Sequence, residues 1–232
     1  MSVVSNNALH NVKNYEIILG EYYFDGDETL YAEFGDHAFD NCVKLKKMNI
    51  PWWIKRIGKY AFAYCTNMRK IYIPEGYITT IEHSTFRKCS KLKTVDIGES
   101  VTVIGDFAFA HCVSLKKLIL PDTITHIGEH AFEHCEKMTK IHISDNCEII
   151  GESAFRSCIR LKKIIIPNNV KVISRNAFFG CVSLKEIIIP DSVTYIDAYA
   201  FYGCYDLKKI IVGRNTEIHP SVKTSGIEIL YR

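Results

Sequence analysis

The chain has 232 residues, of which 47% are hydrophobic and 24% are charged, and its 29 Lys and Arg against 26 Asp and Glu give a formal charge of +3. These values are those of an ordinary globular protein, and they exclude disordered, collagen-like and membrane-spanning classes. The net charge is too small to indicate a polyanionic partner by itself.

The first 30 residues fit no repeat, but they contain apolar side chains such as Ile17, Leu19 and Phe24. Because an open terminal repeat would expose its core, we expect residues 1–30 to form an N-terminal cap. Residues 1–20 lack the basic, apolar and small-residue succession of a secretory signal. The sequence therefore predicts a cytoplasmic protein if the chain is complete, and a cell-surface or secreted one if a leader has been removed.

From residue 31 to residue 213 the chain consists of eight copies of one unit. A Phe recurs every 23 or 24 residues, and a Cys follows each Phe by three positions. Such a period predicts a solenoid in which each unit buries its apolar face against its neighbours. The Phe column is Phe39, Phe62, Phe86, Phe109, Phe132, Phe155, Phe178 and Phe201, and the Cys column is Cys42, Cys65, Cys89, Cys112, Cys135, Cys158, Cys181 and Cys204.

The unit at residues 104–126 illustrates the elements that its spacing predicts. Apolar residues between Ile104 and Leu115 recur at intervals typical of one helical face, so we expect a short helix or helical turn. Residues 118–120 then alternate like a half-buried strand. Pro121 ends that strand with turn chemistry, and an extended run follows at residues 124–127.

These residues resemble the BspA-like subclass of leucine-rich repeats, whose pattern is roughly IxxxAFxxCxxLxxIxIPxxVxx. The resemblance implies an α/β, right-handed solenoid with one short parallel strand and one helical turn per repeat. It also implies a microbial surface or secreted protein that binds host or microbial partners. The chain departs from the pattern in a turn around Tyr77 and Ile78 that is one residue longer, and in single substitutions: Thr85 for Ala, and Gly98, Ser144 and Gly213 for Pro.

Residues 214–232 do not complete a ninth unit. Ile227, Ile229 and Tyr231 alternate like a final strand, without a helix before them. We predict that this C-terminal cap strand pairs beside residues 210–212.

The Cys column predicts buried free thiols. Side chains on neighbouring parallel repeats keep their Cβ atoms about 5 Å apart, beyond the roughly 3.5–4.5 Å that a disulfide needs. No CxxC motif occurs, and Cys147, outside the column, replaces an Ile or Val of the extended run.

Four histidines occur close together in the repeat pattern. His126, His130 and His134 are four residues apart, and His111 occupies the column of His134 one repeat earlier. A zinc site would need three or four such ligands converging on one point. Because these are surface positions of the repeat, we predict no metal site.

No sequence signature of an enzyme is present. The chain contains no GxGxxG, P-loop, GxSxG or HExxH motif, and the repeats leave no room for a separate catalytic domain. We therefore expect no enzymatic activity and no cofactor.

Two neighbouring columns at the start of each strand are basic. They carry a charge of +12 and leave −9 for the rest of the chain, so they could attract an acidic protein, a sulfated glycan, an anionic membrane surface or nucleic acid. They could instead only keep the strands soluble. The first column is Lys46, Arg69, Lys93, Lys116, Thr139, Lys162, Lys185 and Lys208, and the second is Lys47, Lys70, Thr94, Lys117, Lys140, Lys163, Glu186 and Lys209.

The column between the two buried strand positions becomes apolar toward the C-terminus. It consists of Asn49, Tyr72, Asp96, Ile119, His142, Ile165, Ile188 and Ile211. We expect its isoleucines to form an exposed strip that contacts a partner, which includes a second copy of the chain. The alternative is that β-propensity selects these residues and that Lys side chains cover them.

Trp52 and Trp53 follow Pro51 where later repeats have turn residues. They either contribute to an interface or pack against the N-terminal cap.

The sequence thus favours a noncatalytic scaffold that binds a protein partner through its strand face. The alternatives are adhesion to an anionic glycan or cell surface through the Lys columns, and a structural module that self-associates as a homo-oligomer. We predict neither specific nucleic-acid binding nor a membrane span. The predicted contact residues are Tyr72, Ile119, His142, Ile165, Ile188, Ile211, Lys47, Lys70, Lys117, Lys140, Lys163, Lys209, Trp52 and Trp53.

Overall fold

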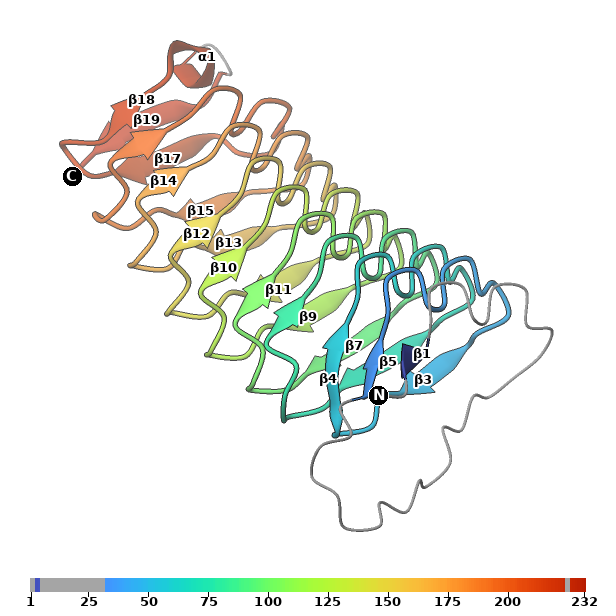
Figure 1. The fold of residues 1–232 in the computed structure, drawn as a ribbon. Helices are drawn as coiled ribbons and strands as arrows, with labels where there is room; N and C mark the ends of the chain where they lie inside the picture. Colours follow the sequence, from blue (N-terminus) through green and yellow to red (C-terminus); the bar gives the residue numbers. More distant parts are fainter. Residues whose placement is uncertain (1–2, 5–31, 224–225) are drawn as a thin grey trace.

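The computed structural model describes residues 3–4, 32–223 and 226–232, and it is a solenoid of short parallel strands (Figure 1). Each complete coil contributes one strand to each of two rows that run along the solenoid. The predicted N-terminal cap, residues 1–30, lies outside the described residues except for Val3–Val4.

The first strand row contains the strands that the repeat pattern predicts. The row is divided into four hydrogen-bonded sheets, and the paired strands within each are parallel and in register, so Lys117 lies beside Lys140 and Ile165 beside Ile188. The row consists of β3 (Lys47–Asn49), β5 (Lys70–Ile73), β7 (Thr94–Ile97), β9 (Lys117–Ile119), β11 (Lys140–His142), β13 (Lys163–Ile165), β15 (Glu186–Ile188), β17 (Lys209–Val212) and β19 (Glu228–Tyr231).

The second strand row is formed by the extended run that precedes each Phe. The prediction of one strand per repeat was therefore wrong, because the extended run also pairs with its neighbours. The row consists of β1 (Val3–Val4), β2 (Ala32–Phe34), β4 (Ile54–Ile57), β6 (Thr80–Ile81), β8 (Val103–Ile104), β10 (His126–Ile127), β12 (Ile149–Ile150), β14 (Val172–Ile173), β16 (Tyr195–Ile196) and β18 (Glu217–Ile218).

The predicted helical turn is wrong, because the segment around each Phe is a chain of tight turns. His130 and His134 have φ angles of 54° and 56°, in the left-handed region that an α-helix excludes. The backbone N–H of Glu133 donates to His130 O within its own coil, whereas the N–H of His134 donates to Arg156 O of the next coil. Alternate N–H groups thus hold the turn and join the coils.

The strand registers locate the extra residue of the longest repeat. Lys70 pairs with Thr94, 24 residues away, whereas Thr80 pairs with Val103, 23 residues away. The extra residue therefore lies between Ile73 and Thr80, as predicted. A Cβ on Gly98 would lie 2.5 Å from Glu75 N, so this close approach explains the glycine where other repeats have proline.

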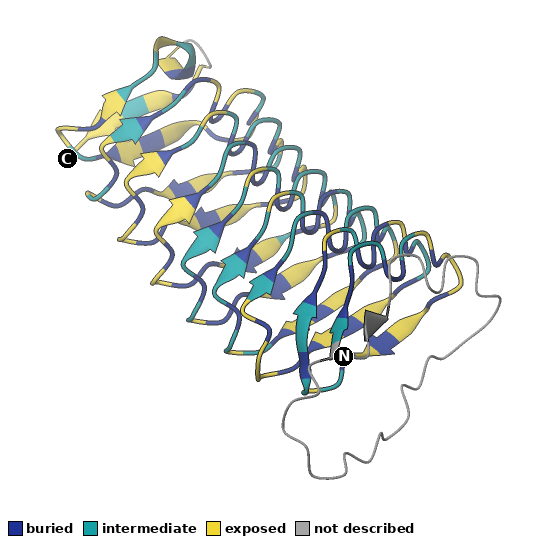
Figure 2. Cartoon of the chain, in the orientation of Figure 1, coloured by how far each residue is buried: buried dark blue, intermediate teal, exposed yellow. Residues whose placement is uncertain are grey.

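The core is a continuous ladder inside the coils, where buried residues recur at equivalent places (Figure 2). All eight Phe of the column have 0% exposure, and successive ring centroids lie 4.9–5.7 Å apart. The nine cysteines are buried thiols outside any disulfide bond, as predicted. From Cys65 onward, each thiol of the column donates a hydrogen bond to the carbonyl oxygen of the Phe 26 or 27 residues before it.

The C-terminal residues extend the first strand row. β19 pairs in parallel with β17, with Ile229 opposite Ile210, where the alternation of Ile227, Ile229 and Tyr231 predicts it. A short helix that the sequence did not predict, α1 (Pro220–Lys223), precedes this strand and buries Val222.

Candidate functional site

The outward side chains of the first strand row form an apolar lane along the solenoid. Ile119 is 75% exposed and Ile165 56%, although the residues on either side of each in its strand are buried. Ile188, Ile211 and Tyr72 are also exposed. Two exposed polar residues interrupt the lane: Asp96 lies between Tyr72 and Ile119, and His142 separates Ile119 from Ile165. The lane continues onto β19 through the exposed Leu230, which faces Ile211 in the register. Sequence reasoning missed Leu230 because residues 214–232 follow no repeat.

Two basic rows flank this lane at the starts of the strands. All thirteen Lys and Arg of the two predicted columns are exposed. Lys163 forms an ion pair of 2.7 Å with Glu186 on the next strand. Among the described residues, six consecutive basic side chains have no ion-pair partner: Arg69, Lys70, Lys93, Lys116, Lys117 and Lys140. Like charges on neighbouring strands repel, so this surface favours a negative partner.

An acidic row lies along the opposite side of the lane, where the strands end. It consists of the exposed Glu75, Glu99, Asp122, Asp145 and Asp191. The sequence reasoning identified residues such as Asp122 only as turn residues, although their recurrence in one column of the repeat was a signal for the row. Asp191 is paired with Arg232, whose Nε lies 2.6 Å from Asp191 Oδ1.

A hollow of about 400 Å³ connects the apolar lane to the acidic row. Its floor includes Ile165 and Ile188, and Asp145, Asp191 and Arg232 also line it. Arg232 Nη2 donates a second hydrogen bond, of 3.0 Å, to Ile189 O. The hollow thus combines an apolar floor with carboxylates at its side.

The two tryptophans behave differently from each other. Trp52 is 62% exposed, whereas Trp53 packs against the core. Their ring centroids lie 6.0 Å apart with the planes nearly perpendicular. The exposed ring belongs to the turn after β3, at the first position of the column that carries the acidic row.

We expect single substitutions to separate these two roles. Trp53→Ser should lower the free energy of unfolding by about 2–4 kcal/mol, because it removes a partly buried aromatic ring from the core. Trp52→Ser should change stability by less than about 0.5 kcal/mol and should instead weaken partner binding. Denaturant unfolding and a binding assay on both variants measure this, and equal losses of stability would contradict it.

The histidines do not converge. His111 and His134 stack with ring centroids 4.7 Å apart, while His130 stacks on Phe107 and its Nδ1 lies 3.0 Å from Glu133 Oε2. Burial and the neighbouring His134 lower the pKa of His111. Among the described residues, no three His, Cys, Asp or Glu side chains form a group that could hold a metal ion.

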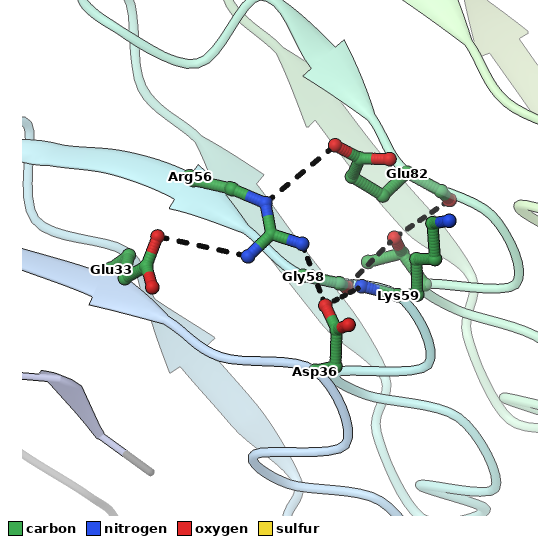
Figure 3. A network of polar contacts seen from close by, with 7 residues as sticks. Glu33, Asp36, Arg56, Gly58, Lys59 and Glu82 are labelled. Atoms are coloured by element: carbon green, nitrogen blue, oxygen red, sulfur yellow. Dashed lines mark hydrogen bonds and ion pairs between the residues drawn. The ribbon is translucent and has the colours of Figure 1, made fainter. Parts of the chain in front are cut away.

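A network of ion pairs around Arg56 of β4 reaches Glu33 on β2 and Glu82 just after β6 (Figure 3). Arg56 lies 2.7 Å from Asp36, and it lies 3.7 Å from both Glu33 and Glu82. Burial alone would raise the pKa of Asp36, but hydrogen bonds from the Lys59 backbone and from Arg56 outweigh burial and lower it. Because every member is paired, we assign this network to stability.

The described part of the chain contains no helix with the length and apolarity that a membrane crossing requires.

Comparison with known proteins gives consistent matches. The family model described as the BspA type leucine rich repeat region matches residues 27–139 and 125–222, in six copies. A leucine-rich repeat protein from Bacteroides ovatus is 25% identical with a TM-score of 0.70, and the match covers 86% of this chain and 64% of that one. A leucine-rich repeat protein from T. pallidum is 28% identical with a TM-score of 0.55, covering 85% of this chain and 78% of that one. No curated protein sequence matches significantly.

Proposed function

Because the chain belongs to the BspA-type leucine-rich repeat family, we propose that it is a noncatalytic scaffold that binds a protein partner through its first strand row. The apolar lane supplies most of the contact energy, and the basic rows attract the partner. The chain spans about 64% of the length of the Bacteroides ovatus protein, and the proposal concerns only the part described here.

The exposed apolar lane is the observation that carries the proposal. Ile165, Ile188, Ile211 and Leu230 lie on four consecutive strands, so they form one contiguous strip. Burying an exposed Ile is worth up to about 1.5–3 kcal/mol, and contiguous apolar surface commonly marks an interface. The lane lies on a preformed stack of strands, so binding costs little ordering of the scaffold.

The substitution Ile188→Asp tests the proposal. It places a charge in the middle of the apolar lane, and we expect at least a tenfold loss of partner affinity. A quantitative pull-down against wild type identifies the partner, and titration then measures the affinity. Val172→Asp is the matched control, because Val172 is 40% exposed on the second strand row and Ile188 is 41% exposed. Equal losses in the two variants would contradict binding through the first row.

A second candidate function, adhesion to an anionic glycan, rests on the six side chains of the basic rows between Arg69 and Lys140 that have no ion-pair partner among the described residues. Changing Lys117, Lys140 and Lys163 to Glu should abolish binding to heparin, and wild-type binding should fall steeply with ionic strength. The protein-binding function predicts a shallower salt dependence and a strong effect of Ile188→Asp. Heparin affinity measured between about 50 and 200 mM salt separates the two, with Lys171→Glu, at the exposed residue that precedes β14, as the control.

A further inference from the structure

We propose that the order of charges across the strand face specifies the partner, which is an amphipathic helix with acidic residues on one flank and arginines on the other. This inference rests on the proposed function, since it names the chemistry of the protein that the same face binds. It adds the acidic row to the apolar lane and the basic rows.

The three kinds of row run side by side and differ in charge, although the exposed Asp96 lies in the apolar lane and Glu186 in a basic row. β5 begins at Lys70, and the side chain of Tyr72 on this strand is exposed. Glu75 follows two residues after the strand ends. Glu75 lies five residues after Lys70, and five extended residues span about 16 Å. The basic and acidic rows are therefore too far apart for their side chains to pair directly. The acidic residues Glu75, Glu99, Asp122 and Asp145 have no ion-pair partner among the described residues. Within the described part of the chain, each kind of row thus holds charges without an ion-pair partner, Lys70 and Lys117 on one side and Glu75 and Asp122 on the other.

The structure contains one example of the contact that the acidic row makes. The guanidinium of Arg232 bridges the carboxylate of Asp191 and the carbonyl oxygen of Ile189, at the end of β15. Asp122 and Asp145 occupy the same position at the ends of β9 and β11, and both are exposed. Arginine suits such sites because its planar group donates several hydrogen bonds at once.

The dimensions of the face fit one helix lying along the solenoid. A helix with its side chains is about 10–12 Å wide, so long Glu and Arg side chains on its flanks span the roughly 16 Å between the rows. From β5 to β15 the first row takes five strand spacings, about 24 Å, which corresponds to about 16 helical residues. The apolar side of such a helix covers Tyr72, Ile119, Ile165 and Ile188.

The charges disfavour the other occupants. The basic rows carry +12 and the acidic row −5, so two copies of the chain placed face to face would leave excess positive charge on both. A uniform polyanion would bind the basic rows but would be repelled by the acidic row. A helix with both kinds of flank satisfies both rows.

Two synthetic peptides test the proposal. Each has 16 residues with a Leu stripe and Glu on one flank, and the other flank carries Arg in one peptide and Gln in the other. We expect wild type to bind the Arg peptide about tenfold more tightly than the Gln peptide, because several exposed ion pairs add their small contributions. A variant with Glu75→Gln, Glu99→Gln, Asp122→Asn and Asp145→Asn should bind the two peptides equally. The matched control neutralises Glu129, Glu148, Asp206 and Glu217, which are exposed outside the row. Circular dichroism checks that each variant is folded.

The outcomes separate this inference from the proposed function. The inference is overturned if wild type shows no preference for Arg, if it binds neither peptide at about 1 mM, or if the neutralised variant keeps the preference. If the Gln peptide binds equally well and loses affinity with Ile188→Asp, then the proposed function stands without the acidic row. A wild-type dimer that the four substitutions dissociate, detected by sedimentation, would identify a second copy as the occupant and overturn the helix.

Discussion

Raising the pH above about 9 is expected to destabilise the protein steeply, because its buried thiols resist ionisation in the folded state. Burial raises the pKa of Cys89, Cys158 and Cys204 from about 9 to about 12. Burial also raises the pKa of Cys147 to about 11, and it raises the pKa of the other five thiols.

The sign of the effect follows from the direction of these shifts. The folded pKa is higher than the unfolded one, so the unfolded chain releases its thiol protons first as the pH rises. The stabilisation is complete below pH 9 and is lost between about pH 9 and pH 12. Each such thiol lowers the free energy of unfolding by about 1.4 kcal/mol per pH unit in this range. Several together would exhaust a typical stability of about 5–15 kcal/mol within one or two pH units.

Denaturant unfolding at a series of pH values under anaerobic conditions measures this slope. The double variant Cys112→Ser and Cys135→Ser is the control, because a Ser hydroxyl can donate to the carbonyl oxygens of Phe86 and Phe109 that the thiols now contact. We expect it to reduce the slope by about 2.7 kcal/mol per pH unit. An unchanged slope would show that the thiols are not the titrating groups.

Replacing Phe132 by Ala should lower the free energy of unfolding by about 3–5 kcal/mol. The ring of Phe132 has no exposed surface, and its centroid lies 5.6 Å from that of Phe109 and 5.4 Å from that of Phe155. Because each coil of a solenoid contacts only its neighbours, a cavity in the middle weakens the coupling between the two halves. We therefore also expect the single unfolding transition to broaden or split, which hydrogen exchange can resolve by segment.

The matched control is Phe179→Ala. Phe179 also stacks on an aromatic ring, that of Tyr202, at 5.3 Å, but it lies on the turn surface and is only partly buried. Its loss should cost about 0.5–1.5 kcal/mol, the usual value of such a ring pair. Similar losses for the two substitutions would contradict the assignment of stability to the inner Phe ladder.

The sequence predicted the solenoid because its core residues recur in register. A Phe at every 23 or 24 positions can form a ladder only if successive coils stack, and the described rings do so. The final strand was also predictable, because Ile227, Ile229 and Tyr231 alternate as β19 requires. The division into an N-terminal cap, eight repeats and a C-terminal cap stays a prediction.

The helical turn was predicted wrongly because apolar spacing does not report backbone hydrogen bonding. The run from Ile104 to Leu115 has helical spacing, but Phe107 and His111 adopt left-handed φ angles of 55° and 61°. Glycine would have signalled this conformation, whereas Phe and His at these positions do not. The second strand row was missed because each of its strands from β6 onward has only two residues, too short for a clear alternation.

The sequence predicted the basic and apolar parts of the candidate surface but not its acidic row. The basic columns were visible because Lys recurs in them, and the apolar column because it holds Ile in four of its eight positions; the Lys and Ile side chains are exposed in the structure. The acidic row changes from Glu at Glu75 and Glu99 to Asp at Asp122 and Asp145, and these residues also have an ordinary explanation as turn residues. That these columns bind a partner stays a prediction.

The extra residue between Ile73 and Thr80 marks a place where the chain can be engineered. Strand pairing and the turn hydrogen bonds fix the length of almost every segment of a coil. An insertion within a paired strand or a hydrogen-bonded turn would therefore shift the register of the side chains that follow it. The corner between Ile73 and Thr80 already holds one more residue than its neighbours, and pairing resumes in register after it. This corner is therefore the place to graft a loop or a reporter without disturbing the stack.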